Sequence, residues 1–344
     1  MQAPSHILVI RFSSMGDVAM TVPVLKNLLD QNPQLQITVV SNAFFQPLFD
    51  GLERCRFHPA FLKDQHKGLP GIYRLYKELK STAPFDAVAD LHNVLRSKLL
   101  SAFFQLSGHK VATLDKGRNE KKQLTRKEDK ECRQLTPMHE RYAEVFRKLS
   151  LPMRLTNDKA IYEKQQLPET LSQLLMRGKK LIGIAPFAQY KEKMYPLEKM
   201  KAIVSQLAQE NYLILLLGAR GEEARTLQEW ENELPSVKNI AGKHSFKEEL
   251  AIISNLDIMV SMDSANMHLA SLFNVPVVSI WGATHHYAGF YGWRQDIKNI
   301  VEIELYCRPC SVFGDIPCYR GDHACMQRLG ESMILKKIAD ISAL

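Results

Sequence analysis

Four polar segments of this 344-residue chain each follow a short apolar run, and their side chains could bind phosphate or move a proton. The first segment carries Ser14, Gly16 and Asp17 after the apolar residues 7–10. A carboxylate there could accept a proton from a hydroxyl group, and a glycine permits a tight backbone turn. The segment has only one glycine and so lacks the G-x-G-x-x-G pattern of dinucleotide-binding dehydrogenases. Asp17 could also do no more than cap the helix expected to follow.

The second polar segment, Asp263 to His268, follows the apolar run at residues 257–261. Asp263 or Ser264 can cap a helix, whose exposed N–H groups and dipole favour an anion such as a diphosphate. His268 stands about one turn into that helix and can face the same place. The alternative is a histidine that only packs in the interior, which is common for this residue type.

The third and fourth segments offer a cation and a carboxylate. Lys193 follows the apolar residues 181–185, and its ammonium group could neutralise phosphate charge, unless it is an ordinary surface lysine. In the fourth segment Gly218 precedes Glu222 and Glu223, and a carboxylate there could bind ribose hydroxyl groups.

Four of the six cysteines lie close together near the end of the chain, in the pattern C-x2-C-x7-C-x6-C: Cys307, Cys310, Cys318 and Cys325. Four thiolates could hold a structural zinc ion, with His323 as a further candidate ligand. The alternative is a reduced, partly buried cluster in a compartment that disfavours disulfides.

Strands that alternate with helices must position these segments. Short, unalternated apolar runs are typical of parallel strands covered on both faces. They occur at residues 7–10, 37–40, 87–89, 110–114, 181–185, 212–217, 257–261 and 275–280. The pattern predicts two doubly wound parallel sheets, which place their ligands at the carboxyl ends of the strands.

The length of 344 residues favours two domains rather than one. We expect the first at residues 1–165, the second at 166–325, and a C-terminal helix at 326–344. Within the first, residues 115–133 mix charges of both signs without an apolar face, which predicts an exposed loop or frayed helix.

The composition, 45% hydrophobic and 24% charged, is typical of a soluble globular protein. Every apolar run is far shorter than a bilayer span, and the N-terminus has no signal-peptide pattern, so we expect a cytoplasmic protein. A net charge of +8 favours an anionic partner. Nucleic acid is the least favoured, because no basic motif is interleaved with aromatic residues.

The motifs together resemble glycosyltransferase family 9, the ADP-heptose:lipopolysaccharide heptosyltransferases. The resemblance spans about residues 6–330. It rests on Ser13-Ser14-Met15-Gly16-Asp17 with Pro23, Asp90-Leu91-His92-Asn93 with Arg96-Ser97, Lys193-Met194-Tyr195-Pro196, Gly218-Ala219, Asp263-Ser264 with His268, Trp281-Gly282-Ala283-Thr284, and the late cysteines. It implies the GT-B fold, in which two Rossmann-like domains, one for the acceptor and one for the nucleotide-sugar, face a cleft and the last helix returns to the first domain.

The resemblance also implies an inverting transfer, with no required metal or cofactor, from ADP-heptose or another nucleotide-sugar to an anionic glycolipid of the lipopolysaccharide core. Asp17 would be the general base, and Lys193 would stabilise the departing diphosphate. The donor-binding residues would be Ser14, Gly16, Gln189, Gly218, Glu222, Asp263, Ser264, Ala265 and His268. The acceptor-binding residues would be Arg96, Lys121, Lys122 and Arg126.

Two other functions stay open from the sequence. One is a nucleotide-sugar epimerase of the same fold, which needs no acceptor. The other is a nucleotide-sugar-binding module without turnover, which Ala265 favours because the family usually has glycine there. The basic segment at residues 116–133 also suggests peripheral association with the inner membrane, since each cation near an anionic surface contributes roughly 1 kcal/mol.

Overall fold

The computed structural model describes residues 4–156, 160–167, 169, 171–172 and 178–343. The chain divides into two compact units. The first contains residues 1–118 and 136–161, and the second contains residues 119–135 and 162–344. The main division therefore lies at residues 161–162, close to the expected one, but a short internal segment belongs to the other unit.

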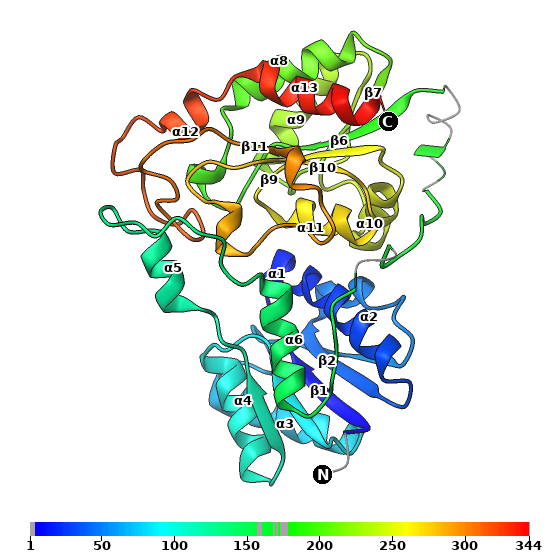
Figure 1. The fold of residues 1–344 in the computed structure, drawn as a ribbon. Coiled ribbons are helices and arrows are strands. Elements are labelled where there is room, and N and C mark those ends of the chain that lie inside the picture. Colours follow the sequence, from blue (N-terminus) through cyan, green and yellow to red (C-terminus); the bar gives the residue numbers. More distant parts are fainter. Residues whose placement is uncertain (1–3, 157–159, 168, 170, 173–177, 344) are drawn as a thin grey trace. The chain divides into compact units, whose positions relative to one another are not determined.

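The first unit is built on a parallel sheet of order β3-β2-β1-β4-β5 (Figure 1). Its strands are β1 His6–Ile10, β2 Gln36–Asn42, β3 Cys55–Ala60, β4 Ala87–Asp90 and β5 Lys110–Thr113. Its helices are α1 Met15–Ala19, α2 Thr21–Gln31, η1 Ala43–Leu48, α3 Gly68–Thr82, α4 Leu95–Leu106 and α6 Met138–Lys148. All four strands predicted for this half are present.

Strand β1 lies in the middle of this sheet and is covered on both faces. Ile7 pairs in register with Ile37 on one side and Ala87 on the other. Successive side chains of a strand point to opposite faces. Since Ile7, Leu8, Val9 and Ile10 are all fully buried, both faces are packed, as the unalternated sequence predicted.

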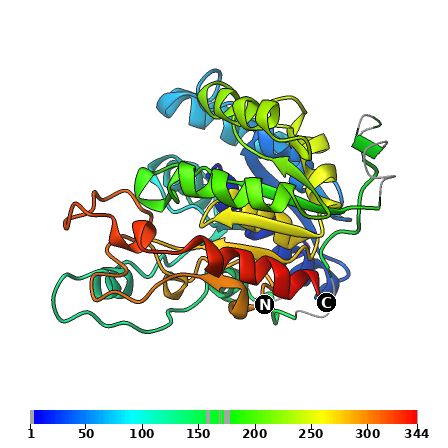
Figure 2. The same cartoon turned by 90° about the horizontal axis from the view of Figure 1, so that it is seen from above.

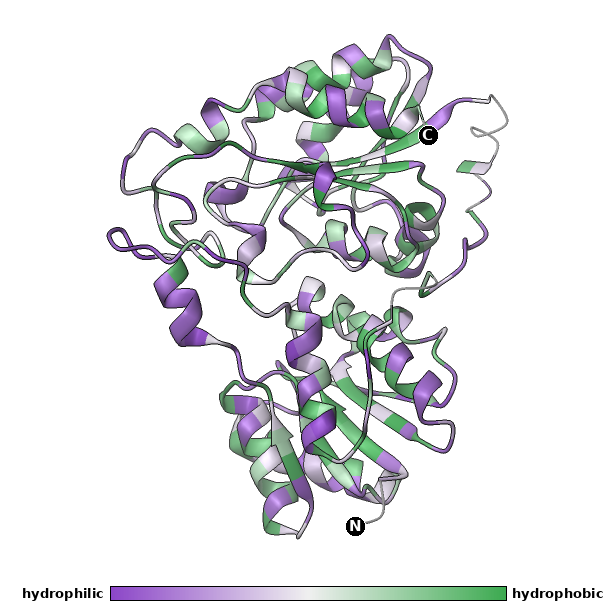
Figure 3. Cartoon of the chain, in the orientation of Figure 1, coloured by the Kyte–Doolittle hydropathy of each residue, from purple (hydrophilic) through white to green (hydrophobic). Residues whose placement is uncertain are grey.

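The second unit has a parallel sheet of order β11-β10-β9-β6-β7-β8. Its strands are β6 Lys180–Ala185, β7 Tyr212–Leu216, β8 Val237–Asn239, β9 Ile258–Met262, β10 Val277–Ile280 and β11 Ile300–Val301. Its helices are η2 Lys191–Lys193, α8 Leu197–Ala208, α9 Glu222–Glu233, α10 Phe246–Ser254, α11 Ala265–Leu272, η3 His286–Ala288, η4 Ile297–Asn299, α12 Ala324–Gln327 and α13 Glu331–Ser342. Two parallel α/β units are thus confirmed, and Figure 3 shows their strands as mainly hydrophobic.

Helix α13 belongs to the second unit and packs on its sheet. Ile334 and Ile338, one turn apart, are buried in the core cluster of the second sheet. The helix lies beside α8 and contacts β9, β10 and β11 (Figure 2). The phenol of Tyr212 also pairs with the hydroxyl of Ser342, with 3.0 Å between the oxygens. The apolar face of α13 is therefore satisfied within its own unit.

The segment at residues 119–135 belongs to the second unit, and we call it the basic strap. Residues 115–133 were predicted to form an exposed loop or a frayed helix; the helix α5 Arg118–Leu124 is present, but Leu124 and Leu135 are buried against Ala288. Lys121 is also buried, with its ammonium 4.2 Å from the ring centroid of Phe290. The charge-rich sequence concealed two buried leucines eleven positions apart, too sparse to form a recognisable apolar face.

In the described part of the chain, no helix combines the length and the apolar character that a bilayer crossing requires.

Candidate functional site

Asp17 lies in the first turn of α1, just past the carboxyl end of β1, and its carboxylate has a fixed orientation. The Arg11 guanidinium lies 2.6 Å from Oδ2, and the Ser14 hydroxyl donates to the same oxygen over 2.7 Å. Arg11 is itself buried and donates to the carbonyl of Leu91. Asp17 is thus the exposed end of a buried, charge-assisted arrangement, which is more than a helix cap requires.

A cationic and aromatic wall surrounds this carboxylate. Tyr142 is fully buried, and its hydroxyl reaches the backbone carbonyl of Asp17 at 3.5 Å. Burial, together with the positive charge of Arg11, lowers the pKa of His92 to about 3, so the imidazole is neutral at physiological pH. Burial and Arg11 also lower the pKa of Lys116. Tyr142 was not singled out from the sequence, and no role beside Asp17 was predicted for Arg11, His92 or Lys116, because only the folded chain brings these side chains to Asp17.

The Asp90-Leu91-His92-Asn93 motif shapes the neighbouring loop. Asp90 Oδ1 accepts the backbone N–H groups of His92 and Asn93, and Oδ2 accepts the Ser97 hydroxyl. Burial raises the pKa of Asp90 despite these contacts. Arg96 is exposed on α4, one residue before Ser97. The motif therefore holds the loop that presents Arg96.

In the second unit, Lys193 and Asp263 form an ion pair of 2.9 Å. Lys193 lies in η2, after β6, and Asp263 directly follows β9. These strands are neighbours in the parallel sheet, so their carboxyl ends meet at one edge. The structure therefore brings together two residues seventy positions apart that the sequence predicted as one site.

The N-terminus of α11 lies at the same edge. Ser264 is the N-cap residue, but its hydroxyl makes no capping bond and pairs with the Ser261 hydroxyl, 3.0 Å between oxygens. Ala265 begins the helix, and His268 is buried one turn further. Asp263, Ser264, Ala265 and His268 thus stand together beside Lys193, where the positive end of a helix dipole favours an anion.

The loop after β7 places Glu223, not Glu222, against the glycine turn. Glu223 Oε2 accepts the backbone N–H of Ala219 over 2.7 Å, whereas Glu222 is exposed. A Cβ atom on Gly218 would lie 3.1 Å from Leu227 and 3.2 Å from Glu223 Oε2, so a larger residue would have to push these side chains aside. Glu222 begins α9 one position too early to reach this turn.

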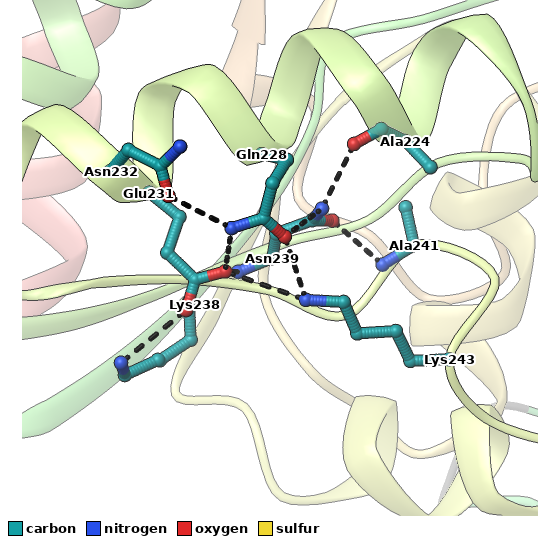
Figure 4. Close-up of polar contacts among 8 residues, drawn as sticks. All are labelled: Ala224, Gln228, Glu231, Asn232, Lys238, Asn239, Ala241 and Lys243. Atoms are coloured by element: carbon teal, nitrogen blue, oxygen red, sulfur yellow. Dashed lines mark hydrogen bonds and ion pairs between the residues drawn. The ribbon is translucent and has the colours of Figure 1, made fainter.

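Figure 4 shows the contacts that fix α9 against β8. Asn239 donates from its side chain to the carbonyl of Ala224 over 3.0 Å, and its backbone N–H reaches Glu231 at 3.3 Å. Burial would raise the pKa of Glu231, but the Asn239 N–H and the Lys243 ammonium outweigh it and lower the pKa. The ionised carboxylate holds the two elements together, and with them the loop before α9.

The predicted donor- and acceptor-binding sets are each divided between the units. Ser14 and Gly16 lie with Asp17 in the first unit, whereas the other predicted donor-binding residues belong to the second. Gln189 is exposed in the loop between β6 and η2. Arg96 belongs to the first unit, but Lys121, Lys122 and Arg126 belong to the second. Lys121 is buried against Phe290, whereas Arg96, Lys122 and Arg126 are exposed.

A buried ionic group that sequence reasoning missed supports the Trp281-Gly282-Ala283-Thr284 motif. Arg308 is buried and donates to the carbonyls of Gly282 and Thr284 and to Glu302, which it reaches at 2.8 Å. Burial would raise the pKa of Glu302, but hydrogen bonds from His286 and Arg308 outweigh it and lower the pKa to about 2. In the sequence, Arg308 is a single arginine between Cys307 and Cys310, and nothing near it indicates that it would bind the carbonyls of the loop after β10.

One group of potential metal ligands is found among the described residues. It consists of His285, His286 and Glu302, whose ligand atoms all lie within 4.8 Å of one another. Burial lowers the pKa of His285 to about 4. Since Arg308 already neutralises Glu302, the group satisfies its own charges and acts as a support for the loop after β10.

Comparisons with known proteins agree with this geometry. The sequence model of glycosyltransferase family 9 (heptosyltransferase) matches residues 72–316. Lipooligosaccharide heptosyltransferase 2 of Campylobacter jejuni is 25% identical over 174 residues, which are 49% of this chain and 54% of that protein. The chain thus spans about half the length of this curated relative. Lipooligosaccharide heptosyltransferase 2 of Haemophilus influenzae is 26% identical over 326 residues, 87% of this chain and 90% of that protein.

The fold agrees as well. The solved structure of the Escherichia coli ADP-heptose lps heptosyltransferase II superposes with a TM-score of 0.68 at 19% identity, covering 98% of each chain. The two parallel-sheet units therefore have the GT-B-like architecture that the sequence predicted.

Proposed function

Because the chain belongs to glycosyltransferase family 9, we propose that it moves a heptose from ADP-heptose to an anionic glycolipid of the lipopolysaccharide core. The observation that carries this proposal is the Lys193–Asp263 ion pair beside the N-terminus of α11. A cation and a helix N-terminus at one sheet edge suit the diphosphate of a nucleotide-sugar. The names of the relatives support heptose as the sugar, and the E. coli structure supports ADP as the nucleotide.

Donor activation falls to the second unit in this proposal. When the bond between the anomeric carbon and the diphosphate oxygen breaks, its electron pair leaves with ADP. The Lys193 ammonium and the first N–H groups of α11 stabilise the charge that builds on this oxygen. Asp263 orients Lys193 before the donor arrives, Ser264 and His268 contact the diphosphate region, and Glu223 takes the ribose role first given to Glu222.

Acceptor activation falls to Asp17. The acceptor oxygen attacks the anomeric carbon from the face opposite ADP, its proton passes to the Asp17 carboxylate, and the configuration inverts. Arg11 and Ser14 hold the carboxylate through Oδ2. These two contacts fix the orientation in which the carboxylate would accept the proton. No metal or cofactor takes part in the proposed step.

The exposed cations Arg96, Lys122 and Arg126 remain candidates for contacts with the anionic acceptor. We place the reaction at the cytoplasmic face of the inner membrane, where a lipid-anchored acceptor would be presented. Sedimentation with vesicles tests this part: binding that does not depend on anionic lipid would contradict it.

The test of the function is release of nucleoside diphosphate from ADP-, GDP- and UDP-sugars, with and without a core glycolipid acceptor. The proposal predicts release that requires the acceptor and is fastest with ADP-heptose, together with a glycosylated acceptor as product. Conversion of the donor sugar without acceptor would favour an epimerase. Donor binding without any turnover would favour a binding module, for which Ala265 at the start of α11 is the residue to examine.

A further inference from the structure

The four clustered cysteines line one small cavity of the second unit. Cys307, Cys310, Cys318 and Cys325 all border a cavity of about 10 Å³. A volume of this size is close to the room that a single water-sized sphere occupies. The cavity is therefore about the size of one ion, the four cysteines contribute to its lining, and all four are free thiols.

The segment around the cavity contains no regular secondary structure. Between β11, which ends at Val301, and α12, which begins at Ala324, the structure assigns no helix or strand. Several large apolar side chains there are exposed, among them Tyr306, Phe313, Ile316 and Tyr319. Short segments without an apolar core of their own are commonly held by disulfides or by a structural metal. With free thiols, a metal is the remaining cross-link of this kind.

The charges around the cavity complement a metal thiolate. A divalent ion bound by four thiolates carries a net charge of about −2. The Lys130 ammonium donates to the carbonyls of Cys307 and Pro309, at 2.8 Å each. Arg308 and Arg320 also line the cavity. The Lys130 ammonium is therefore placed to balance part of the charge of the occupied site, whereas Arg308 and Arg320 are already paired with Glu302 and Asp322.

We propose that Cys307, Cys310, Cys318 and Cys325 bind one thiol-preferring divalent ion, zinc or iron, as a structural site. Four thiols lose four protons to the solvent, and four sulfur–metal bonds form without any change of oxidation state. A metal–sulfur distance near 2.3 Å places the sulfurs roughly 3.8 Å apart. Among the described residues no three of the cysteine sulfurs lie within 4.8 Å of one another, so metal binding would require the sulfurs to move closer together.

The His285–His286–Glu302 group is closer together but is a poorer site. Arg308 already binds Glu302, so a cation entering there would have to displace a buried guanidinium. The cysteine cavity has no such occupant, and its thiols suit zinc or iron better than one carboxylate and two imidazoles beside an arginine.

The ion would also stabilise two neighbouring parts of the molecule. Gly314, between Cys310 and Cys318, has a positive φ of 77° and packs so closely on Lys193 that a Cβ atom would lie 2.4 Å from its Cγ. Lys130 joins the basic strap to the carbonyls beside Cys307. Metal binding therefore supports the aliphatic stem of Lys193 from one side and anchors the strap from the other.

The test is the metal content of the full-length protein, measured by elemental analysis after purification without chelators or metal-affinity resins. We expect about one zinc or iron per chain in the wild type and below about a tenth in Cys310→Ser/Cys318→Ser. The matched control is Cys132→Ser, an exposed cysteine of the strap, which should keep the full amount. The elemental result distinguishes zinc from iron and requires neither donor nor acceptor, so it is independent of the proposed transfer.

A second measurement does not depend on how the variant folds. Chelator-treated wild-type protein should bind about one Co²⁺ with the visible spectrum of a tetrahedral thiolate site, and zinc should displace it. Trypsin should cut the strap, which contains Lys122, Arg126 and Lys127, about ten times faster without the metal. Metal-free wild type that takes up no Co²⁺, or disulfides among these cysteines, would overturn the site; metal binding without any change in cleavage would overturn the anchoring of the strap.

Discussion

The two units each end a strand in a carboxylate–cation pair, and the two pairs are exposed in opposite ways. In the first unit the cation Arg11 is 5% exposed and the carboxylate Asp17 is 25% exposed. In the second unit the carboxylate Asp263 is 8% exposed and the cation Lys193 is 15% exposed. In each pair one charge is thus more accessible than the other. The first unit offers a base and the second offers a cation, which is the division of labour that the proposed transfer requires.

The largest effect should follow from removing the exposed base. Asp17→Asn keeps the shape and the contact with Ser14 but cannot take up the acceptor proton, so kcat should fall by about 10² to 10⁴. The KM for the nucleotide-sugar should change little. Steady-state kinetics with both substrates measures this. If the variant instead lost donor affinity at unchanged kcat, Asp17 would be a binding residue, and the contrast between a base in the first unit and a cation in the second would be wrong.

Removing the exposed cation should have the next largest effect. Lys193→Ala leaves the diphosphate charge unsupported in the transition state, so kcat/KM should fall by about 10² to 10³. Lys193→Arg, which keeps the charge, should recover part of this loss. Isothermal titration of ADP with each variant separates weaker binding from slower chemistry. Equal activity of the alanine and arginine variants would show that charge is not what Lys193 contributes.

Removing the buried carboxylate should have a smaller effect, because Asp263 acts by orienting Lys193. Asp263→Asn should weaken donor binding about tenfold, equivalent to roughly 1.4 kcal/mol, with a smaller change in kcat. The same titration measures it. If Asp263→Asn reduced kcat/KM as much as Lys193→Ala, Asp263 would contact the substrate directly. Both charges of the pair would then take part in binding the substrate.

The last expected effect concerns stability rather than catalysis, and is a pH dependence shared by both units. Burial lowers the pKa of His92 to about 3 and that of His285 to about 4, both from an ordinary value of 6.5. Below about pH 6.5 the unfolded chain binds protons that the folded chain does not, so the free energy of unfolding should decrease as pH falls from there towards 4. Urea denaturation across this range measures it. His92→Gln should flatten the curve; an unchanged curve would mean that His92 titrates normally.

The strands that the sequence failed to predict, β3, β8 and β11, all lie at sheet edges, whereas every central strand and one edge strand, β5, were predicted. Strand β1 reads as a continuous apolar run because both of its faces are covered. In contrast, β3 is an edge strand and has no continuous apolar run, because the polar residues Arg56 and His58 interrupt it. It also includes Pro59, which an edge strand tolerates. Strands β8 and β11, also at edges, contain three and two residues, too few for any periodicity.

The site was predictable where its residues follow strands, and not where they arrive from elsewhere. Asp17, Lys193 and Asp263 stand just past strands of parallel sheets, so their clustering at the sheet edges follows from topology. Lys116 and Arg308 reach their partners only through the path of loops, and nothing local marks them. Glu222 and Glu223 differ by one helical step, a rotation of about 100° around the helix axis. The first residue of a helix cannot be located from the sequence to within one position, so the sequence could not decide between the two.

The basic strap has a consequence for dividing this protein into its parts. The polypeptide changes unit at residues 118–119, 135–136 and 161–162, so no single cut separates the two. A fragment ending at residue 161 would carry Leu124 and Leu135 without Ala288, against which they pack. Such a fragment exposes two leucines that the whole chain buries, and would tend to aggregate. A protein designed to contain only the first unit would instead omit residues 119–135 and join residue 118 to residue 136 through a short linker.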